Sequence, residues 1–436
     1  MKKRYAQVGT GGRASFFYEA VASVYRDTSE MVAFCDISQT RMNYANKLLV
    51  KNGAKAVPQY DYTEFDKMID ETKPDCIIVT SVDRTHHTYI IRGMEKGCDI
   101  ITEKPMTIDE HKTQAIIDCQ KHTGKDLRVT FNYRYTPFNT KMREIIMNGV
   151  IGDVFSVHFE WLLDTQHGAD YFRRWHRNKL NSGGLLVHKS THHFDLVNFW
   201  LGTHPDRVFA YGDLNFYGMN NAEKRGVTNF YYRCHGSDAA KDDPLAIDLE
   251  ANEMSRELYL NAEADSGYIR DRSVFSDDIS IEDTMGVLVK YKSGAILTYS
   301  LNAYLPWEGF IVNINGSKGR IELKVLEQPN ITEKEEKEVI CAASKDANSA
   351  RIEDSIALTV YPMFGKPWEE EIIEEVGGHG GGDPILLNDI FGVPKADPYN
   401  RKASVVDGAM SILTGIAANK SIASGLEVKI DELVKF

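Results

Sequence analysis

The sequence Gly9-Thr10-Gly11-Gly12-Arg13-Ala14 directly follows a short apolar run and opens a stretch with helical spacing. Gly9 permits the tight turn after a strand, Gly11 lets the backbone approach a pyrophosphate, and Ala14 allows a helix to pack closely on the sheet. The helix N-terminus adds free N–H groups and a favourable dipole for phosphate. This context predicts a dinucleotide-binding loop, to which Gly12 and Arg13 also belong. Glycines alone would equally fit an ordinary turn.

Short apolar runs alternate with helical stretches over the first 134 residues, which is the pattern of a parallel sheet with crossover helices. The strand-like runs are Arg4 to Val8, Met31 to Asp36, Asp75 to Ser81, Asp99 to Glu103 and Leu127 to Phe131. The helical stretches are Arg13 to Arg26, Ser38 to Lys51, Thr85 to Lys96 and Asp109 to His122. We therefore expect an α/β fold in which residues 1–134 form a doubly wound Rossmann domain that binds NAD(P).

Asp36 stands at the end of the second strand-like run, where a carboxylate can hydrogen-bond the adenosine ribose hydroxyls of a dinucleotide. An acid at this position repels a 2′-phosphate, so the sequence favours NAD over NADP. Ser38 and Arg41 could still accommodate the phosphate, which leaves NADP open. The alternative interpretation of Asp36 is a helix cap.

After Pro137 the pattern changes to one more helix, Asn139 to Asn148, and then to longer alternating segments. These segments predict a mixed or antiparallel sheet, with turns at 291–295 and at Asn315 to Gly319. They are Val154 to Leu162, Asp283 to Tyr291 and Ala295 to Asn302, and a final helix spans Ser404 to Ala423. We expect residues 135–436 to form an α+β domain for substrate binding and oligomerisation. Residues 216–280 give no clear pattern, and Glu333 to Glu338 is expected to be a solvated loop.

At 436 residues, the chain exceeds the roughly 250–300 residues at which a single core stops growing, which supports two domains. The net charge of −12, without a stripe of Lys and Arg, argues against a nucleic-acid partner. The six cysteines are scattered, and no apolar run approaches about 18 residues. The basic start at Met1 to Arg4 lacks the apolar region of a signal peptide. We therefore expect reduced thiols, no membrane association and a cytoplasmic location.

Glu103-Lys104-Pro105 ends the fourth strand-like run. The carboxyl ends of the strands in a doubly wound sheet face the ligand crevice, so Lys104 is expected to point toward the nicotinamide. A lysine at a strand end is otherwise simply solvated.

The segment from Ser182 to Asp195 carries the second catalytic signal. Helical spacing from Leu185 onward places His188 and His192 four residues apart on one face, with Asp195 on the same side. His192 is the candidate general base, because a histidine can take a hydroxyl proton while a hydride leaves the same carbon. Two alternatives remain: His-x-x-x-His with a carboxylate can hold zinc, and His193 and Asp195 can satisfy each other or the backbone.

Two further stretches fit the same crevice. His167 to Arg177 combines aromatic faces with guanidinium donors, the mixture that stacks on sugar rings and grips hydroxyls. Its candidate substrate contacts are Tyr171, Arg174 and Trp175, and the alternative is a buried aromatic and ion-pair cluster. The glycine-rich loop from Gly377 to Asp383 presents His379 as a further candidate, although such loops are often inert.

The chain resembles the glucose-fructose oxidoreductase and inositol dehydrogenase family over nearly its whole length. The likeness rests on several motifs together, which are far more specific than any one of them. They are the glycine loop, Ser81-Val82-Asp83-Arg84-Thr85-His86, Glu103-Lys104-Pro105, Asn132-Tyr133-Arg134-Tyr135-Thr136-Pro137 and the Gly-Gly-helix segment at 183–195. The resemblance implies that the second domain is built on an open-faced, largely antiparallel sheet, and that the chain forms a homo-oligomer.

The resemblance also implies roles for single residues. Lys104 would contact the substrate hydroxyl and orient the nicotinamide, and His192 would act as acid or base. His86 would shape the site near the cofactor. We also expect Ser81 and Glu103 to lie at the cofactor, and Arg134 and His193 at the substrate. Two departures limit the transfer: His188 stands where the family often has Asp, and Val82-Asp83 stands where Pro-Asn is common. His188 is kept as a third candidate catalytic residue.

The function that these features favour is hydride transfer between NAD(P) and a secondary hydroxyl or ketone of a sugar, polyol or sugar derivative. A redox-neutral alternative uses a transient keto-sugar for glycoside cleavage, elimination or epimerisation, and the additional histidines favour it. A third hypothesis is a nucleotide-sensing regulator without catalysis, against which Lys104 and His192 argue. The sequence leaves open the sugar, the carbon oxidised, the reaction direction and the oligomeric state. We expect no metal.

Overall fold

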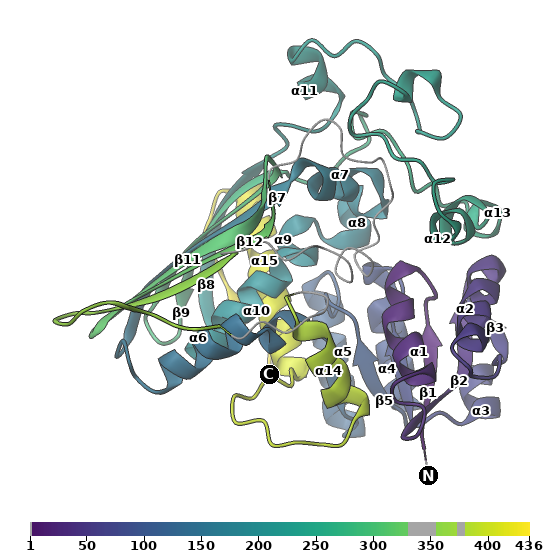
Figure 1. Ribbon diagram of the computed structural model, residues 1–436, viewed down its shortest axis with the longest axis horizontal. Coiled ribbons are helices and arrows are strands. Elements are labelled where there is room, and N and C mark those ends of the chain that lie inside the picture. Colours follow the sequence, from purple (N-terminus) through teal and green to yellow (C-terminus); the bar gives the residue numbers. More distant parts are fainter. Residues whose placement is uncertain (1, 330–354, 373–379) are drawn as a thin grey trace.

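The N-terminal part of the chain forms a six-stranded parallel sheet in the order β3-β2-β1-β4-β5-β6. This computed structural model describes residues 2–329, 355–372 and 380–436. The strands are β1 (Lys3–Val8), β2 (Ser29–Asp36), β3 (Gln59–Asp61), β4 (Cys76–Val79), β5 (Asp99–Thr102) and β6 (Leu127–Val129). The helices are α1 (Ser15–Ala22), α2 (Gln39–Lys51), α3 (Phe65–Thr72), α4 (His86–Glu95) and α5 (Glu110–Thr123) (Figure 1). The doubly wound Rossmann fold expected from the sequence is confirmed.

The sequence did not predict two elements of this domain, β3 and α3. β3 has only three residues at the edge of the sheet, and of these only Tyr60 is buried. A strand of this kind carries no apolar run that periodicity could detect. All four residues of β4, by contrast, are buried, as is typical of a parallel strand covered on both faces.

The second domain is built on a nine-stranded sheet in the order β14-β13-β12-β11-β7-β10-β9-β8-β15. Neighbouring strands are antiparallel except for β7 and β10, which are parallel. The predicted hairpins at 291–295 and 315–319 join β9 to β10 and β11 to β12. The strands are β7 (Val154–Asp164), β8 (Pro205–Asp213), β9 (Thr284–Tyr291), β10 (Ile296–Leu305), β11 (Glu308–Gly316), β12 (Gly319–Gln328), β13 (Ile356–Pro362), β14 (Trp368–Glu369) and β15 (Val428–Lys429).

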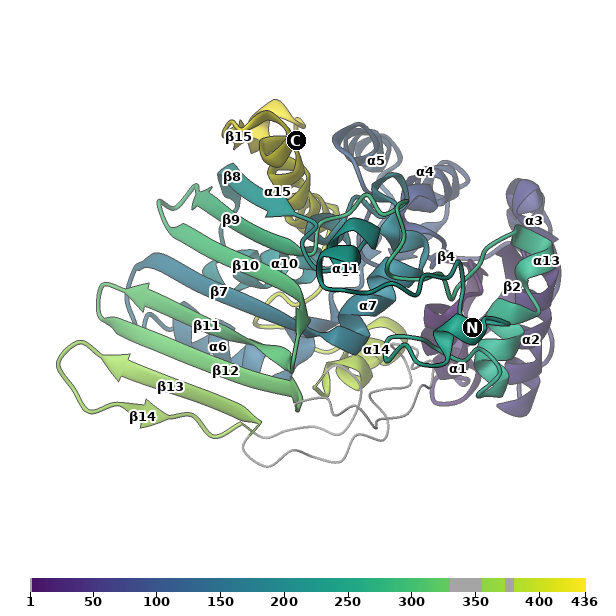
Figure 2. The ribbon, with the colours of Figure 1, turned by 90° about the horizontal axis from the view of Figure 1, so that it is seen from above.

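Helices cover one face of this sheet and leave the other face open, as Figure 2 shows from above. The covering layer comprises α6 (Pro137–Met147), α9 (Leu185–His188), α10 (Ser190–Leu201) and α15 (Val405–Ser424). The helices α9 and α15 pack tightly, because a Cβ at Gly415 would lie 2.1 Å from the carbonyl oxygen of Leu186. Tyr211, Leu288 and Ile296 are exposed side chains of the open sheet. The homo-oligomer expected to use this face stays a prediction.

Two segments of the second domain reach the first one. The stretch 216–280, which the sequence left uninterpreted, carries α11 (Met219–Lys224), α12 (Glu253–Ser255) and α13 (Glu263–Ser266), and its last part packs against α2. The helix α14 (Gly382–Phe391) lies against the first sheet, where the ring of Phe391 meets that of Tyr5 at 5.0 Å. The remaining helices are α7 (Thr165–Arg173) and α8 (Lys179–Ser182).

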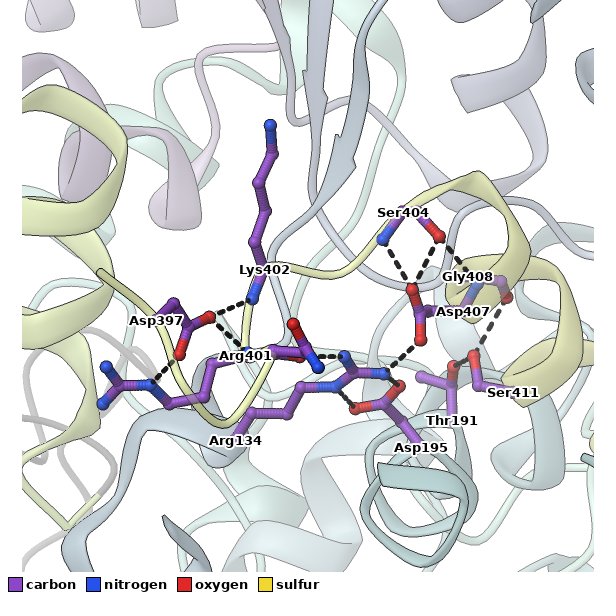
Figure 3. A network of polar contacts seen from close by, with 11 residues as sticks. Arg134, Thr191, Asp195, Asp397, Arg401, Lys402, Ser404, Asp407, Gly408 and Ser411 are labelled. Carbon is purple, nitrogen blue, oxygen red and sulfur yellow. Dashed lines mark hydrogen bonds and ion pairs between the residues drawn. The ribbon is translucent and has the colours of Figure 1, made fainter. Parts of the chain in front are cut away.

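A buried arginine joins the two domains at the end of β6. Arg134 is 2% exposed, and its Nε and Nη2 donate to the two carboxylate oxygens of Asp195 in α10, at 2.7 and 2.6 Å. Nη2 also donates to Asp407 in α15 at 2.9 Å, as Figure 3 shows. Buried charges are tolerated only when they are paired and hydrogen-bonded in good geometry. This ion-pair network therefore fixes α10 and α15 against the end of β6.

None of the helices in the described ranges is both long and apolar enough to cross a lipid bilayer. The cytoplasmic location expected from the sequence stays a prediction.

We expect Asp195→Asn to destabilise the protein by about 3–5 kcal/mol, because it leaves the Arg134 charge buried without its bidentate partner. Urea unfolding followed by circular dichroism measures this loss. Asp126→Asn is the matched control, since the ion pair of Asp126 with Lys402 also joins distant segments but is half exposed. Equal unfolding midpoints for the two variants would contradict the structural role of the buried pair.

Candidate active site

The glycine loop lies between the ends of β1 and β4, and the space around Gly9 differs from that around Gly11. Gly9 has a positive φ of 84°, and a Cβ there would lie 2.6 Å from the backbone of Thr80 and Ser81. A Cβ on Gly11 would meet no atom within 4 Å. The tight turn thus requires Gly9, while the space over Gly11 suits a ligand. Ala14 is fully buried beside Tyr18, as close helix packing requires.

Asp36 ends β2 and fastens the glycine loop to it. Its Oδ2 accepts hydrogen bonds from the backbone N and the Oγ1 of Thr10, at 2.5 and 3.0 Å, and its Oδ1 accepts from the backbone N of Ser38 at 2.8 Å. The cap of α2 is Ser38, whose Oγ accepts from the backbone N of Arg41. The helix-cap interpretation of Asp36 is therefore wrong. The ribose contact of Asp36 stays a prediction.

Arg13 links the glycine loop to the strand end that carries Lys104. Its Nε donates to Glu103 Oε1 at 2.9 Å, and Glu103 Oε2 accepts from the backbone N of Lys104 at 3.1 Å. Asp383, in the first turn of α14, lies 3.7 Å from Arg13 and accepts a hydrogen bond from Asn132 at 2.8 Å. The start of α14 therefore adjoins the glycine loop. The predicted substrate contact His379 lies outside the described residues.

His86 fixes the two chain segments that follow β4 and β5. The ring is fully buried, with Nδ1 2.8 Å from the carbonyl oxygen of Pro105 and Nε2 2.9 Å from that of Ser81. Burial lowers the pKa of His86, so the neutral ring donates to one of the two carbonyls at a time. The structure gives His86 a positioning role beside Lys104, and its contact with the cofactor stays a prediction.

Lys104 follows β5 and is half-buried near the start of the second domain's helical layer. Its Nζ donates to the backbone oxygen of His188 at 3.5 Å. Burial lowers the pKa of Lys104 to about 8, although the carboxylates of Glu103 and Asp83 act in the opposite direction. A lysine with this pKa exchanges its proton near neutral pH, and perturbed groups of this kind cluster at catalytic sites.

The two departures from the family pattern, Asp83 and His188, contact each other directly. His188 Nδ1 lies 2.5 Å from Asp83 Oδ2, and both side chains are buried. Burial raises the pKa of Asp83 and lowers that of His188, because it disfavours the charged form of each. A carboxylate on Nδ1 orients the imidazole and leaves Nε2 for a ligand. The pair therefore forms an acid–base unit beside Lys104.

The single helix expected from Leu185 onward is two helices. α9 ends at His188 and α10 begins at Ser190. The backbone N of Lys189 still donates to the oxygen of Leu185, four residues earlier, whereas the backbone N of His192 donates to the oxygen of Lys189, three residues earlier. Lys189 turns inward at this break, with its Nζ 4.7 Å from the centre of the Trp161 ring. His188 and His192 therefore do not share a continuous helix face.

His192 lies in α10 against the residues that follow β6. Its ring packs edge-on to Tyr133 at 5.0 Å and to Phe131 at 6.0 Å, and the residue is 4% exposed. These contacts place His192 at the carboxyl end of the first sheet, where a bound dinucleotide is expected.

Two predicted substrate contacts lie in the interior instead. His193 is fully buried, stacked on Trp161 at 3.9 Å, with its Nδ1 2.6 Å from Tyr299 Oη. Arg134 is the buried residue that binds Asp195, so both side chains serve the fold. The zinc alternative required the carboxylate of Asp195, and both of its oxygens accept hydrogen bonds from Arg134.

The predicted aromatic cluster surrounds the Asp83–His188 pair. The Tyr171 ring meets His188 edge-on at 5.6 Å, and Trp175 does so at 5.9 Å. Arg174 binds Asp170 at 3.0 Å, and Asp170 also pairs with Arg173 and Arg270. Tyr171 is buried, as expected of a buried aromatic and ion-pair cluster, while Arg174 and Trp175 are half-buried and thus partly accessible to a ligand. The substrate contacts of all three stay predictions.

Sequence reasoning missed a polar chain that ends at Tyr171. Tyr171 Oη lies 3.1 Å from His167 Nε2, and His167 Nδ1 lies 2.7 and 2.9 Å from the two carboxylate oxygens of Glu308. The four-residue spacing of His167 and Tyr171 could have predicted their contact, because residues four apart in a helix are neighbours on one face. No sequence spacing could have predicted the contacts of Glu308 and Asp83, because their partners are distant in the sequence.

Two protein-family models match the chain. Residues 3–131 match "Oxidoreductase family, NAD-binding Rossmann fold", and residues 143–430 match "Oxidoreductase family, C-terminal alpha/beta domain". YteT of Bacillus subtilis (strain 168) is 38% identical over 396 residues, which cover 86% of each protein. The myo-inositol 2-dehydrogenase of Thermotoga maritima is 21% identical over 433 residues, 99% of each protein. The structure of an aldose-aldose oxidoreductase from Caulobacter crescentus has the same fold, with a TM-score of 0.62 and 15% identity over 98% of this chain and 100% of that one.

We expect Gly11→Ala to weaken NADH binding by about tenfold or more, or ~1.4 kcal/mol, because the methyl group enters the space that the cofactor phosphates need. Titration of NADH fluorescence measures the affinity. The unfolding midpoint should stay unchanged, since a Cβ there meets no protein atom. Gly286→Ala in β9 is the matched control, with equally open space. Unchanged affinity in Gly11→Ala would show that the pyrophosphate does not approach this loop.

Proposed function

The chain belongs to the GFO/IDH/MocA oxidoreductase family, and from this premise we propose that it transfers a hydride between NAD and a secondary hydroxyl or ketone of a sugar, polyol or sugar derivative. The observation that carries the proposal is the placement of Lys104, which contacts His188 from the second domain and has its pKa lowered to about 8 by burial. Relatives named for inositol and aldose chemistry support the substrate class.

The glycine loop and Asp36 would hold the cofactor, and the open space at Gly11 fits its phosphates. NAD supplies the acceptor for the hydride when it is bound. The protein's own residues handle the proton and the charge. In our proposal His192 takes the hydroxyl proton, and the ammonium of Lys104 stabilises the negative charge that develops on the substrate oxygen.

The aromatic side chains of Tyr171 and Trp175 would orient the sugar ring over these groups. Their partly polar faces suit stacking on C–H surfaces and bonding to hydroxyls. Arg174, held by Asp170, adds a donor at the same wall. The regulator hypothesis gives no reason for a half-buried lysine, Lys104, beside an Asp–His pair, so we favour catalysis.

A redox-neutral reaction is the second candidate, and a specific observation favours it. The Asp83–His188 pair lies beside Lys104, and the Tyr171 ring, which begins the polar chain through His167 to Glu308, packs edge-on to His188 at 5.6 Å. Oxidation of one hydroxyl requires only one base, which accepts the hydroxyl proton. A second unit could remove the proton that a neighbouring ketone acidifies, as elimination, epimerisation or glycoside cleavage requires.

A panel of sugars, polyols, sugar acids and glycosides tests the proposal. Each compound is incubated with enzyme and NAD, and both NADH absorbance and products are followed. We expect NADH in proportion to the oxidised product, and loss of turnover in Lys104→Met and His192→Ala. Turnover without net NADH would support the redox-neutral reaction instead. Full activity in both variants would exclude these two residues as the catalytic groups.

The pH profile tests the charge state of Lys104. Because its pKa is lowered to about 8, the ammonium form is lost as the pH rises through that value. We therefore expect kcat/KM for sugar oxidation to fall above a pH of about 8. Lys104→Arg keeps its charge, so its residual activity should lack this fall. A fall that persists in Lys104→Arg would assign the pKa to another group.

A further inference from the structure

A segment of the second domain, residues 246–270, crosses to the Rossmann domain and lies along α2; we call it the strap. Tyr44 of α2 shares an apolar cluster with Leu249, Leu258 and Tyr259 of the strap, all of them buried. The strap carries α12 and α13, which Figure 1 shows beside α2. This contact brings second-domain side chains to the carboxyl end of β2.

Asp265 is the strap residue that reaches this end. Its Oδ2 accepts hydrogen bonds from Ser38 Oγ at 2.7 Å and from the backbone N of Thr40 at 2.9 Å. These bonds lower the pKa of Asp265, so the side chain is a carboxylate. Ser38 caps α2 and Thr40 lies in its first turn, where unpaired N–H groups attract anions. The strap therefore supplies the anion that this helix end favours.

The same position decides between the two dinucleotides. In Rossmann domains the residues after the second strand face the adenosine ribose, and a 2′-phosphate needs donors there. Ser38 and Arg41 are the donors that the sequence offers for it. The strap engages both of them, because Ser38 Oγ binds Asp265 and Arg41 Nε donates to the carbonyl oxygen of Leu258 at 2.8 Å.

We propose that Asp265 is a cofactor-specificity residue, which takes the Ser38 and Thr40 donors and adds a second negative charge beside Asp36. The two carboxylates come from different domains, and both oppose the dianionic phosphate of NADP. Selection of NAD thus depends on docking of the strap as well as on the glycine loop. The proposal rests on the NAD site of the proposed function and is independent of the substrate.

The strap also ends at the substrate wall. Arg270 is 2% exposed and pairs with Asp170 at 2.7 Å, and Asp170 holds Arg174. The strap is thus anchored at the adenosine end by Asp265 and at the sugar end by Arg270. The Arg270–Asp170 ion pair and the apolar cluster with Tyr44 hold the strap against both domains, so Asp265 is held in place even though its own side chain is exposed.

Binding of NADH and NADPH to the full chain without substrate tests the proposal, with fluorescence titration as the readout. We expect wild type to bind NADH more tightly, and Asp265→Asn to gain about tenfold in NADPH affinity while its NADH affinity changes little. The gain should shrink at high salt, because it comes from a lost charge. Asp265→Glu retains the charge and should keep the wild-type preference.

Glu253→Gln is the matched control, since Glu253 is an exposed strap residue that binds Lys47 away from the end of β2. It should leave the ratio of the two affinities unchanged. An unchanged NADPH affinity in Asp265→Asn, or an equal loss for both nucleotides, would overturn the specificity role while leaving NAD binding intact. Wild type that binds neither nucleotide would instead contradict the proposed function itself.

Discussion

The bidentate ion pair between Arg134 and Asp195 determines how the two domains meet. Both side chains are buried, so loss of the Asp195 carboxylate would leave the Arg134 charge with Asp407 as its remaining carboxylate partner, at a cost of roughly 3–5 kcal/mol. Arg134 follows β6 of the first sheet, and Asp195 lies in α10 of the second domain. The pair therefore sets α10, and with it His192, against the carboxyl end of the parallel strands. His188, in the preceding short helix, reaches Lys104 from the same side.

The candidate active site consequently contains residues from both domains. The first domain supplies Lys104 and Asp83 from the ends of β5 and β4, and the second supplies His188. Asp83 and His188, the two departures from the family pattern, contact each other directly, with His188 Nδ1 2.5 Å from Asp83 Oδ2.

The sequence was sufficient for the features that depend on local order. The glycine loop, Lys104 at a strand end and the α/β pattern follow from periodicity and spacing. Contacts between distant residues could not be predicted: His188 and Asp83 are 105 positions apart, and Asp265 is 227 positions from Ser38. Arg134 and His193 looked like substrate contacts because a polar side chain in a motif gives no sign of burial. The break at Lys189 could not be predicted either, because helical spacing continues through it and the contact of Lys189 with Trp161 is between distant residues.

The central claim is that this two-domain site moves a hydride between a sugar C–H and NAD. A sugar deuterated at its carbon-bound positions tests it directly, in a single turnover followed by mass spectrometry of the recovered cofactor. We predict reduced cofactor that is one mass unit heavier in wild type and absent in Lys104→Met. Product formed without any deuterium in the recovered cofactor would contradict the account, because no net hydride transfer to the nicotinamide would then have occurred.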